Sequence, residues 1–139
     1  MNFQEWQSTV PLIIRSDTVW KVEAYRLALF LSDLSWEDTS KLVRDERTRD
    51  CAGQLLRAAG KISAQITEGY SRNTGRERSR WYEYALGSAR ECRDWYYKGR
   101  HVLTVQVADH RMELTSSIIR LTLTMASHER RTNRKIIHD

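Results

Sequence analysis

Residues 51–72 read CAGQLLRAAGKISAQITEGYSR, and this stretch decides the fold class. Apolar or small side chains recur along it every three or four residues, at Cys51, Leu55, Ala58, Ile62 and Ile66. This spacing places them on one face of an α-helix, which has about 3.6 residues per turn. Gly69 follows directly, and glycine is a frequent residue at helix ends. The stretch therefore predicts an amphipathic helix over residues 48–69.

The residues that come next predict a second helix. Thr74-Gly75-Arg76-Glu77 has the T-x-x-E spacing of a capping box, in which the threonine and glutamate side chains each bond a backbone N–H group at the helix start. An apolar stripe then continues at helical spacing through Trp81, Ala85, Ser88, Cys92, Trp95, Gly99 and Val102. We expect this helix to span residues 74–102.

Two further helices are expected on either side of this pair. Residues 17–34 carry the apolar stripe Trp20, Ala24, Leu27, Leu31 and Leu34, with Ser16 or Asp17 as the N-cap. Ser35 to Asp38 has a variant capping-box pattern, which predicts a separate short turn of helix. Residues 108–130 carry the stripe Leu114, Ile118, Leu121 and Met125. Residues 131–139 are expected to form a flexible basic tail.

The composition supports a purely helical chain. The 139 residues have the length of one domain, and one proline with six glycines provides too few turns for a β-sandwich or barrel. Hydrophobic residues make up 40% of the chain, which is enough to build a core. The predicted fold class is all-α, an antiparallel up-down four-helix bundle in a single domain over residues 1–139.

Charge and cysteine content narrow the class of protein. Lys and Arg number 23 against 18 Asp and Glu, so the net charge of +5 favours weak attraction to polyanions. The only two cysteines lie far apart in sequence, which is typical of reduced thiols rather than of a secreted disulfide framework. No signal peptide and no membrane-spanning apolar run is evident. We expect a cytoplasmic protein without membrane contact.

Each predicted helix carries more apolar surface than one core stripe requires. The additional positions include Tyr25 and Leu29, Leu56 and Ala59, Tyr82 and Leu86, and Ile119 and Leu123. A broad apolar surface on a small helical protein can be buried against another subunit, and the sequence therefore predicts a homo-oligomer. The alternative interpretation is a wide core stripe that includes these flanks.

Four positions are assigned structural or packing roles. Gly87 lies in the middle of a predicted helix, where glycine costs about 1 kcal/mol relative to alanine, and with neighbouring Ser88 it suggests a tight helix crossing. Glu68 lies in the last turn of its helix, where the helix dipole disfavours a negative charge. We expect Arg72, Arg76 or another basic side chain to reach across the corner at Gly69 and pair with it.

Three motifs carry a resemblance to a known family. They are Q-L-L-R-A-A at 54–59, I-S-A-Q-I-T-E-G-Y-S-R at 62–72 and Y-A-L-G-S-A-R-E at 84–91. The chain thereby resembles the bacterial four helix bundle protein family, first noticed as reading frames in intervening sequences of large-subunit ribosomal RNA genes. The resemblance implies a bundle that assembles into a homopentameric ring. A more distant analogy is the accessory variability determinant of diversity-generating retroelements, which binds a reverse transcriptase and nucleic acid.

No constellation of catalytic residues is evident in the sequence. No histidine pair lies at i, i+4 spacing beside a carboxylate, which a metal site on one helix would need. Cys51 and Cys92 lie on apolar stripes and are interpreted as buried thiols rather than nucleophiles. We therefore expect a protein that is not an enzyme, with no catalytic residue, no cofactor and no metal site.

Basic residues are the remaining candidates for function. Arg72, Arg76 and Arg80 gather at the corner between the second and third predicted helices, and Lys98 and Arg100 lie further along, interleaved with aromatic residues. Cations beside aromatic rings can hold phosphates and stack bases, so all five are candidate nucleic-acid-binding residues. The alternative is a solvated helix face with ion pairs at i, i+4 spacing.

The leading hypothesis is an oligomeric helical adaptor that binds RNA or DNA, a nucleic-acid enzyme such as a reverse transcriptase, or both. The second hypothesis is a scaffold that binds only proteins, through apolar surface left exposed after assembly. An enzyme ranks third, because the inner helix positions are apolar or small instead of polar.

Overall fold

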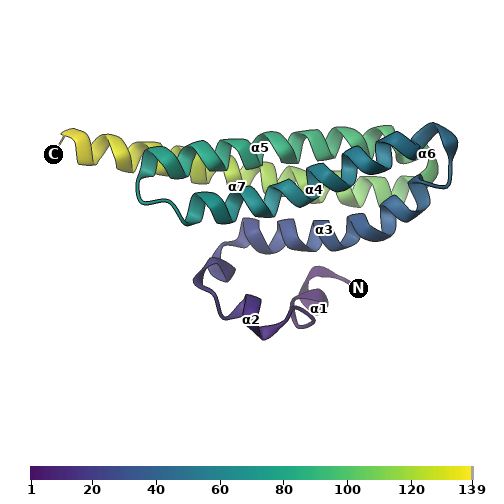
Figure 1. Ribbon diagram of the computed structural model, residues 1–139, viewed down its shortest axis with the longest axis horizontal. Coiled ribbons are helices and arrows are strands. Elements are labelled where there is room, and N and C mark those ends of the chain that lie inside the picture. The colour runs from purple at the N-terminus through teal and green to yellow at the C-terminus, as the bar shows by residue number, and fades with distance from the viewer. Residues whose placement is uncertain (139) are drawn as a thin grey trace.

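The computed structural model describes the backbone of residues 1–138 and the side chains of residues 1–132. Every regular element in this part of the chain is a helix, which confirms the all-α class. Figure 1 shows four long helices side by side, namely α3 (Glu23–Leu42), α4 (Arg49–Tyr70), α5 (Gly75–Lys98) and α7 (Val105–His138). A 3₁₀ turn, η2 (Glu46–Thr48), leads from α3 into α4, a short non-helical turn at residues 71–74 joins α4 to α5, and a short helix links α5 to α7.

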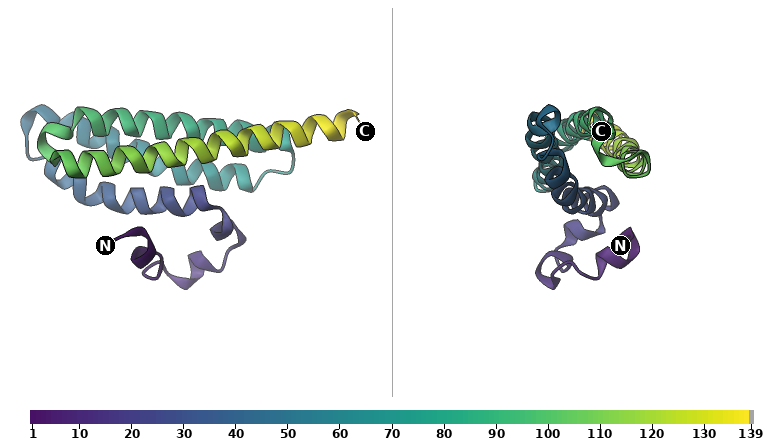
Figure 2. Two further views of the ribbon diagram at one scale, coloured as in Figure 1. Left: turned by 180° about the vertical axis from the view of Figure 1, so that it is seen from behind. Right: turned by 90° about the vertical axis from the view of Figure 1, so that its right-hand side faces the viewer.

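The hydrophobic core lies between the four long helices. Each long helix contacts the next one along the chain, and α3 also contacts α7. Seen along their axes, the helices form an arc with α3 and α7 at its two ends (Figure 2, right). Side chains from all four are fully buried in this core, including Leu31, Leu55, Ile62, Tyr96 and Ile118.

The first long helix starts later and ends later than the sequence predicted. Asp17 is indeed a cap, but its side chain accepts from the Val19 amide to begin only a 3₁₀ turn, η1 (Thr18–Lys21). Val22 is extended, and α3 starts after it. At the other end Ser35 starts no new helix, because its hydroxyl donates back to the Ser32 carbonyl within a continuous α3.

The remaining helices differ from expectation at the end of α5 and at both ends of α7. The structure places α4 and the start of α5 within one residue of the predicted bounds. Helix α5 ends at Lys98, and α6 (Arg100–Leu103) then turns the chain at Thr104, which has a positive φ of 80°. Helix α7 continues past the expected end at residue 130 through His138, so residues 131–138 are helical rather than a flexible tail. Residue 139 and the side chains from 133 onward lie outside the described part.

The N-terminal arm, residues 1–21, forms helical turns that the sequence analysis did not predict. It contains α1 (Phe3–Gln7) and α2 (Leu12–Arg15), and Figure 1 shows it lying along the side of α3. Trp6 and Phe30 of α3 form a second small core, and the Trp6 indole N–H donates to Asp33 at 2.7 Å. The capping box of Asn2 and Glu5 that starts α1 was the available sequence signal.

The additional apolar positions divide between the core and the surface of the single chain. Tyr25, Ala59, Tyr82 and Ile119 are buried in the main core, Leu29 and Leu86 are partly buried against it, and Leu56 and Leu123 are exposed. Half of the named positions therefore belong to the core of one chain, and the homo-oligomer stays a prediction.

The two glycines singled out in the sequence have opposite surroundings. A Cβ atom added at Gly87 would meet nothing within 4 Å, so the tight crossing expected there is wrong for the single chain. A Cβ atom at Gly69 would lie 2.7 Å from Cε1 of Tyr82 and 2.9 Å from Cβ of Trp81. Close approach of α4 and α5 therefore depends on Gly69, at the corner, rather than on Gly87.

The two cysteines are unpaired thiols in the core. Both are buried, and burial raises the pKa of Cys51 and, more strongly, of Cys92. A raised pKa disfavours the reactive thiolate at neutral pH. No helix described over residues 1–138 is both long enough and apolar enough to cross a membrane.

Candidate nucleic-acid interface

The corner between α4 and α5 is held in place by local bonds. The Thr74 side chain caps α5 by accepting from the Glu77 amide. The Arg78 guanidinium donates to the Arg72 carbonyl at 3.0 Å and forms an ion pair with Glu129 of α7 at 2.8 Å. A second ion pair, Arg130 to Glu83, also joins α7 to α5 at this end. These bonds position the short turn at residues 71–74 against two helices.

A pocket opens on the outer side of this corner. We call it the corner pocket, and it is lined by Arg72, Glu77, Arg80, Trp81 and Tyr84. The Trp81 and Tyr84 rings meet edge to face, with centroids 5.4 Å apart. The Arg72 guanidinium lies over the Trp81 ring at 5.4 Å, and that of Arg80 lies over Tyr84 at 5.8 Å. Two cations and two aromatic faces thus share one opening.

The two arginines of the corner pocket differ in how far their charge is neutralised. Arg72 forms an exposed ion pair with Glu68 at 2.7 Å, which offsets the unfavourable placement of Glu68 near the end of α4. Arg80 donates at 2.8 Å to the Tyr84 hydroxyl, a neutral acceptor. Among residues 1–132 Arg80 has no ion pair, so its positive charge is available to an anionic ligand.

Glu77 forms only half of the capping box that its spacing predicts. Its backbone amide donates to the Thr74 hydroxyl at 3.2 Å, but the reciprocal bond from its carboxylate does not form. Within residues 1–132 the Glu77 carboxylate accepts no hydrogen bond, and it lines the corner pocket instead. The pocket therefore has a hydrogen-bond acceptor beside its two cations.

The five candidate nucleic-acid-binding residues do not form one site. Arg72 and Arg80 flank the corner pocket, whereas Arg76 is exposed on the first turn of α5 and does not line it. Lys98 is 18 residues beyond Arg80, about 27 Å along the helix. Lys98 pairs with Asp94 at 2.7 Å, and Arg100 lies over Tyr97 at 3.9 Å. The five candidates therefore lie in two separate places, as their order along the sequence indicated, and their binding of nucleic acid stays a prediction.

Ser88, one of the predicted packing residues, links α5 to α4. Its hydroxyl donates to Oε1 of Gln65 at 2.7 Å, and its side chain is buried. This contact lies between the corner pocket and the distant pair Lys98 and Arg100. It contributes to the α4–α5 packing and touches neither cluster.

The sequence analysis missed the aromatic half of the corner pocket. Trp81 was assigned to the core stripe, but its ring is only partly buried and lines the pocket. Helical spacing could have grouped the residues, because Glu77 and Trp81, and likewise Arg80 and Tyr84, are four residues apart. The period alone does not separate the centre of a buried face from its edge.

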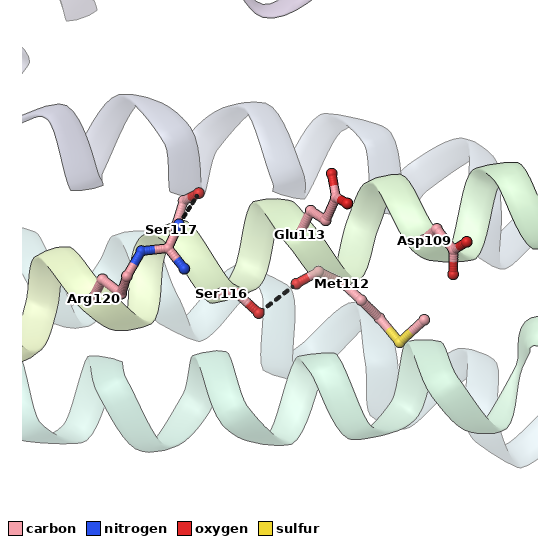
Figure 3. A pocket seen from close by; sticks show the side chains of 6 residues that line it. All are labelled: Asp109, Met112, Glu113, Ser116, Ser117 and Arg120. Atoms are coloured by element: carbon pink, nitrogen blue, oxygen red, sulfur yellow. Dashed lines mark hydrogen bonds between the residues drawn. The ribbon is translucent and has the colours of Figure 1, made fainter.

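A different pocket along α7 has the wrong charge for nucleic acid. It is lined by Asp109, Met112, Glu113, Ser116, Ser117 and Arg120. Figure 3 shows Asp109, Glu113 and Arg120 projecting from the same helix, with the Ser116 hydroxyl bonded to the Met112 carbonyl. Two carboxylates against one arginine would repel phosphate, so this pocket does not compete with the corner pocket as a polyanion site.

A second arginine–aromatic cluster lies at the other end of the four long helices. We call it the buried cluster, and it consists of Asp38, Tyr96 and Arg111, with the exposed ring of His110 beside it, its Nδ1 atom 2.7 Å from the Arg111 guanidinium. Arg111 donates to both carboxylate oxygens of Asp38, at 2.7 and 3.2 Å, and the Tyr96 hydroxyl donates to the same carboxylate at 2.8 Å. Burial and the nearby Asp38 charge raise the pKa of Tyr96. This cluster ties α3, α5 and α7 together.

The class defined by these observations is an all-helical protein with a cation–aromatic pocket at one end. Within the described side chains, no group of three His, Cys, Asp or Glu residues is placed to hold a metal ion. The family model described as 23S rRNA-intervening sequence protein matches residues 20–127, and the chain belongs to this family. The resemblance noted in the sequence is thereby confirmed. A search of curated proteins found no match.

The family match excludes most of the N-terminal arm. Helices α1 and α2 precede residue 20, where the match begins. All of the corner pocket and the buried cluster lie within the matched residues. The candidate interface therefore lies within the matched residues, and most of the arm precedes them.

Proposed function

We propose that this protein is a non-enzymatic adaptor that binds single-stranded nucleic acid through the corner pocket. The observation that carries the proposal is the arrangement of Arg72 and Arg80 over the rings of Trp81 and Tyr84. Arginine supplies phosphate contacts, while exposed aromatic rings supply stacking surfaces that tolerate any base. The net charge of +5 adds a general attraction to the polyanion.

The assembly and cellular context are also part of the proposal. The four long helices act as an antiparallel up-down bundle, and several copies form a homo-oligomer, with the pentameric ring implied by the family resemblance as the expected form. A ring repeats the corner pocket in every subunit, so weak single contacts combine into stronger overall binding. The partner enzyme would be a nucleic-acid enzyme, with a reverse transcriptase as the analogy, in the cytoplasm.

A salt titration of binding tests the nucleic-acid proposal. Fluorescence anisotropy with a labelled 20-nucleotide single-stranded RNA, and with its DNA counterpart, measures the dissociation constant from low to physiological salt. The log–log slope should be about −0.7 for each phosphate neutralised on a single strand. The triple variant R72Q/R76Q/R80Q should flatten this slope, while the helical circular dichroism signal stays unchanged.

Two controls separate binding through the corner pocket from binding that depends only on net charge. The variant R44Q/R49Q/R57Q removes three exposed arginines elsewhere and the same amount of positive charge. It should bind RNA more tightly than the triple corner variant. Truncation after Thr132 removes Arg134 and Lys135, whose side chains lie outside the described part, and measures their contribution separately. Equal binding by the parent and the triple corner variant at every salt concentration would contradict the proposal.

The alternative function is a scaffold that binds only proteins. A groove between α3 and α4 favours it, because the apolar side chains of Trp36, Val43 and Leu56 line this groove and are 69%, 46% and 37% exposed. Contiguous apolar surface of this kind marks protein contacts. The salt titration distinguishes the cases, because a protein that binds no nucleic acid even at low salt would favour the scaffold. Light scattering tests the assembly separately, since a pentamer has five times 16.4 kDa, about 82 kDa.

A further inference from the structure

We infer that the corner pocket selects an unpaired guanine from single-stranded nucleic acid. The inference rests on the proposed function and deepens it, because it names the base that enters the pocket. Three features carry it: a partly exposed indole, a carboxylate without a hydrogen-bond partner in the described part of the chain, and two arginines at the rim. Each corresponds to one part of a guanine nucleotide.

Trp81 supplies the surface on which the base stacks. Its Cβ atom lies against Gly69, and its ring is held edge to face by Tyr84, so the indole is fixed from two sides. The Arg72 guanidinium, a flat cation, already lies over this ring at 5.4 Å. Bases stack both on aromatic rings and on guanidinium planes. A base that displaces the flexible Arg72 side chain outward would lie between the indole and the guanidinium.

Glu77 supplies selectivity for one base edge. A carboxylate accepts two parallel hydrogen bonds, and guanine alone among the four common bases offers two adjacent donors, N1–H and N2–H, on its Watson–Crick edge. Adenine and cytosine offer a single amino group there, next to acceptor nitrogens that a carboxylate repels. The Glu77 carboxylate is available for this pairing because its capping bond to the Thr74 amide does not form.

The rim arginines account for the rest of the nucleotide. Arg80 has no ion pair among residues 1–132 and is exposed, so it can bond a phosphate beside the stacked base. The Watson–Crick edge must be unpaired to reach Glu77, and therefore a duplex is excluded as the ligand. The side chains that line the pocket thus favour a guanine in a single strand or loop.

The test compares nine-nucleotide uridine RNAs that carry one central guanine, inosine, adenine or cytosine. Fluorescence anisotropy should give about tenfold tighter binding for the guanine oligomer than for the adenine or cytosine oligomers, the size of effect typical of one bidentate pair. Inosine keeps N1–H and lacks the 2-amino group, so its affinity should be intermediate. The same oligomers in DNA show whether the sugar contributes.

Glu77→Gln is the critical variant, and Glu91→Gln is its matched control. Both remove one exposed carboxylate from α5, but Glu91 does not line the corner pocket. The ratio of guanine to adenine affinity should fall to near one in E77Q and stay near ten in E91Q. Because both variants gain the same net charge, a general rise in affinity cancels in the ratio.

Tryptophan fluorescence locates the bound base independently. The guanine oligomer should quench part of the emission of the wild type, and this quenching should be lost in W81F but kept in W36F, which alters the exposed tryptophan of α3. Salt-dependent binding with equal affinity for all four oligomers would overturn the guanine inference and leave the proposed function standing. Retention of the preference in E77Q would also overturn it. No binding of any oligomer at low salt would overturn both.

Discussion

The corner pocket and the buried cluster use similar side chains under opposite conditions. Each combines an arginine, a carboxylate and an aromatic ring. In the buried cluster Asp38 and Arg111 are only 1% and 14% exposed, and they pair with each other through two bonds. In the corner pocket Arg80 is exposed and bonds only a phenol hydroxyl within the described part.

The difference shows that pairing and burial decide the role of such residues. The Asp38–Arg111 ion pair and the Tyr96 hydrogen bond fix the positions of α3, α5 and α7. Because these charged groups are paired and buried, they are not accessible to a ligand. Charge that remains exposed beside aromatic rings contributes little to stability and can bind a polyanion. Variants at the buried cluster and at the exposed corner test this distinction.

The largest effect is expected for Asp38→Asn in the buried cluster. The change leaves the Arg111 guanidinium without a counter-charge in a largely buried position, and breaking a buried pair in this way costs about 3 kcal/mol or more. By contrast, Arg80→Gln at the exposed corner should change the free energy of unfolding by at most about 0.5 kcal/mol. Urea denaturation monitored by circular dichroism measures both values.

The double variant Asp38→Asn with Arg111→Met tests the cause. Replacing both charges should recover much of the lost stability, because apolar side chains can substitute for a buried ion pair. If D38N alone unfolds at the same urea concentration as the wild type, the buried cluster does not hold the helices together.

An intermediate effect is expected for Gly69→Ala, beneath the corner pocket. The new methyl group would lie 2.7 Å from the Tyr82 ring and 2.9 Å from Cβ of Trp81, so the rings must shift. Overpacking of this kind costs roughly 1–3 kcal/mol. Since Trp81 lines the corner pocket, G69A should also weaken RNA binding, whereas D38N should leave the affinity of the folded protein unchanged.

Gly87→Ala is the matched control for the glycine at the corner. The site is open and lies within a helix, so alanine should stabilise the single chain by up to about 1 kcal/mol. Thermal unfolding and light scattering measure the two effects together. A drop in oligomer mass in G87A would instead place Gly87 at a contact between subunits.

The smallest effect concerns pH and His110, at the surface of the buried cluster. Burial, and then the adjacent Arg111, lower the pKa of His110 below its usual value of 6.5. The unfolded chain therefore binds this proton more readily than the folded chain, and stability should decrease as the pH falls from 6.5 through the lower folded pKa. Urea midpoints at pH 7.5 and 5.5 should differ less in H110Q than in the wild type.

Local signals predicted the long helices well where caps and glycines mark their ends. Gly69 and Thr74 bound the α4–α5 corner, and the structure places that turn as expected. The start of α3 was mispredicted, because a cap such as Asp17 begins a 3₁₀ turn as readily as an α-helix. The Ser35 hydroxyl bonds backward along α3, and only the tertiary structure decides between that bond and a new cap.

The candidate site was only half predictable, because helix packing rather than local sequence decides which of its side chains are exposed. Charge clustering identified Arg72 and Arg80, but the 3.6-residue period assigned Trp81 to the core. Its exposure depends on how α4 and α5 approach each other at Gly69, which is a property of the packed pair of helices. The failure of Glu77 to close its capping box is likewise invisible in the sequence.

The direction of α7 has a practical consequence for work with this protein. Figure 1 shows α7 projecting beyond the α4–α5 turn, at the end that carries the corner pocket, while the N-terminus lies beside α3. A polyhistidine tag or a fluorophore at this end of the chain would therefore extend from the side that carries the corner pocket. The same label attached before Met1 would be remote from it, and is the better choice for immobilisation.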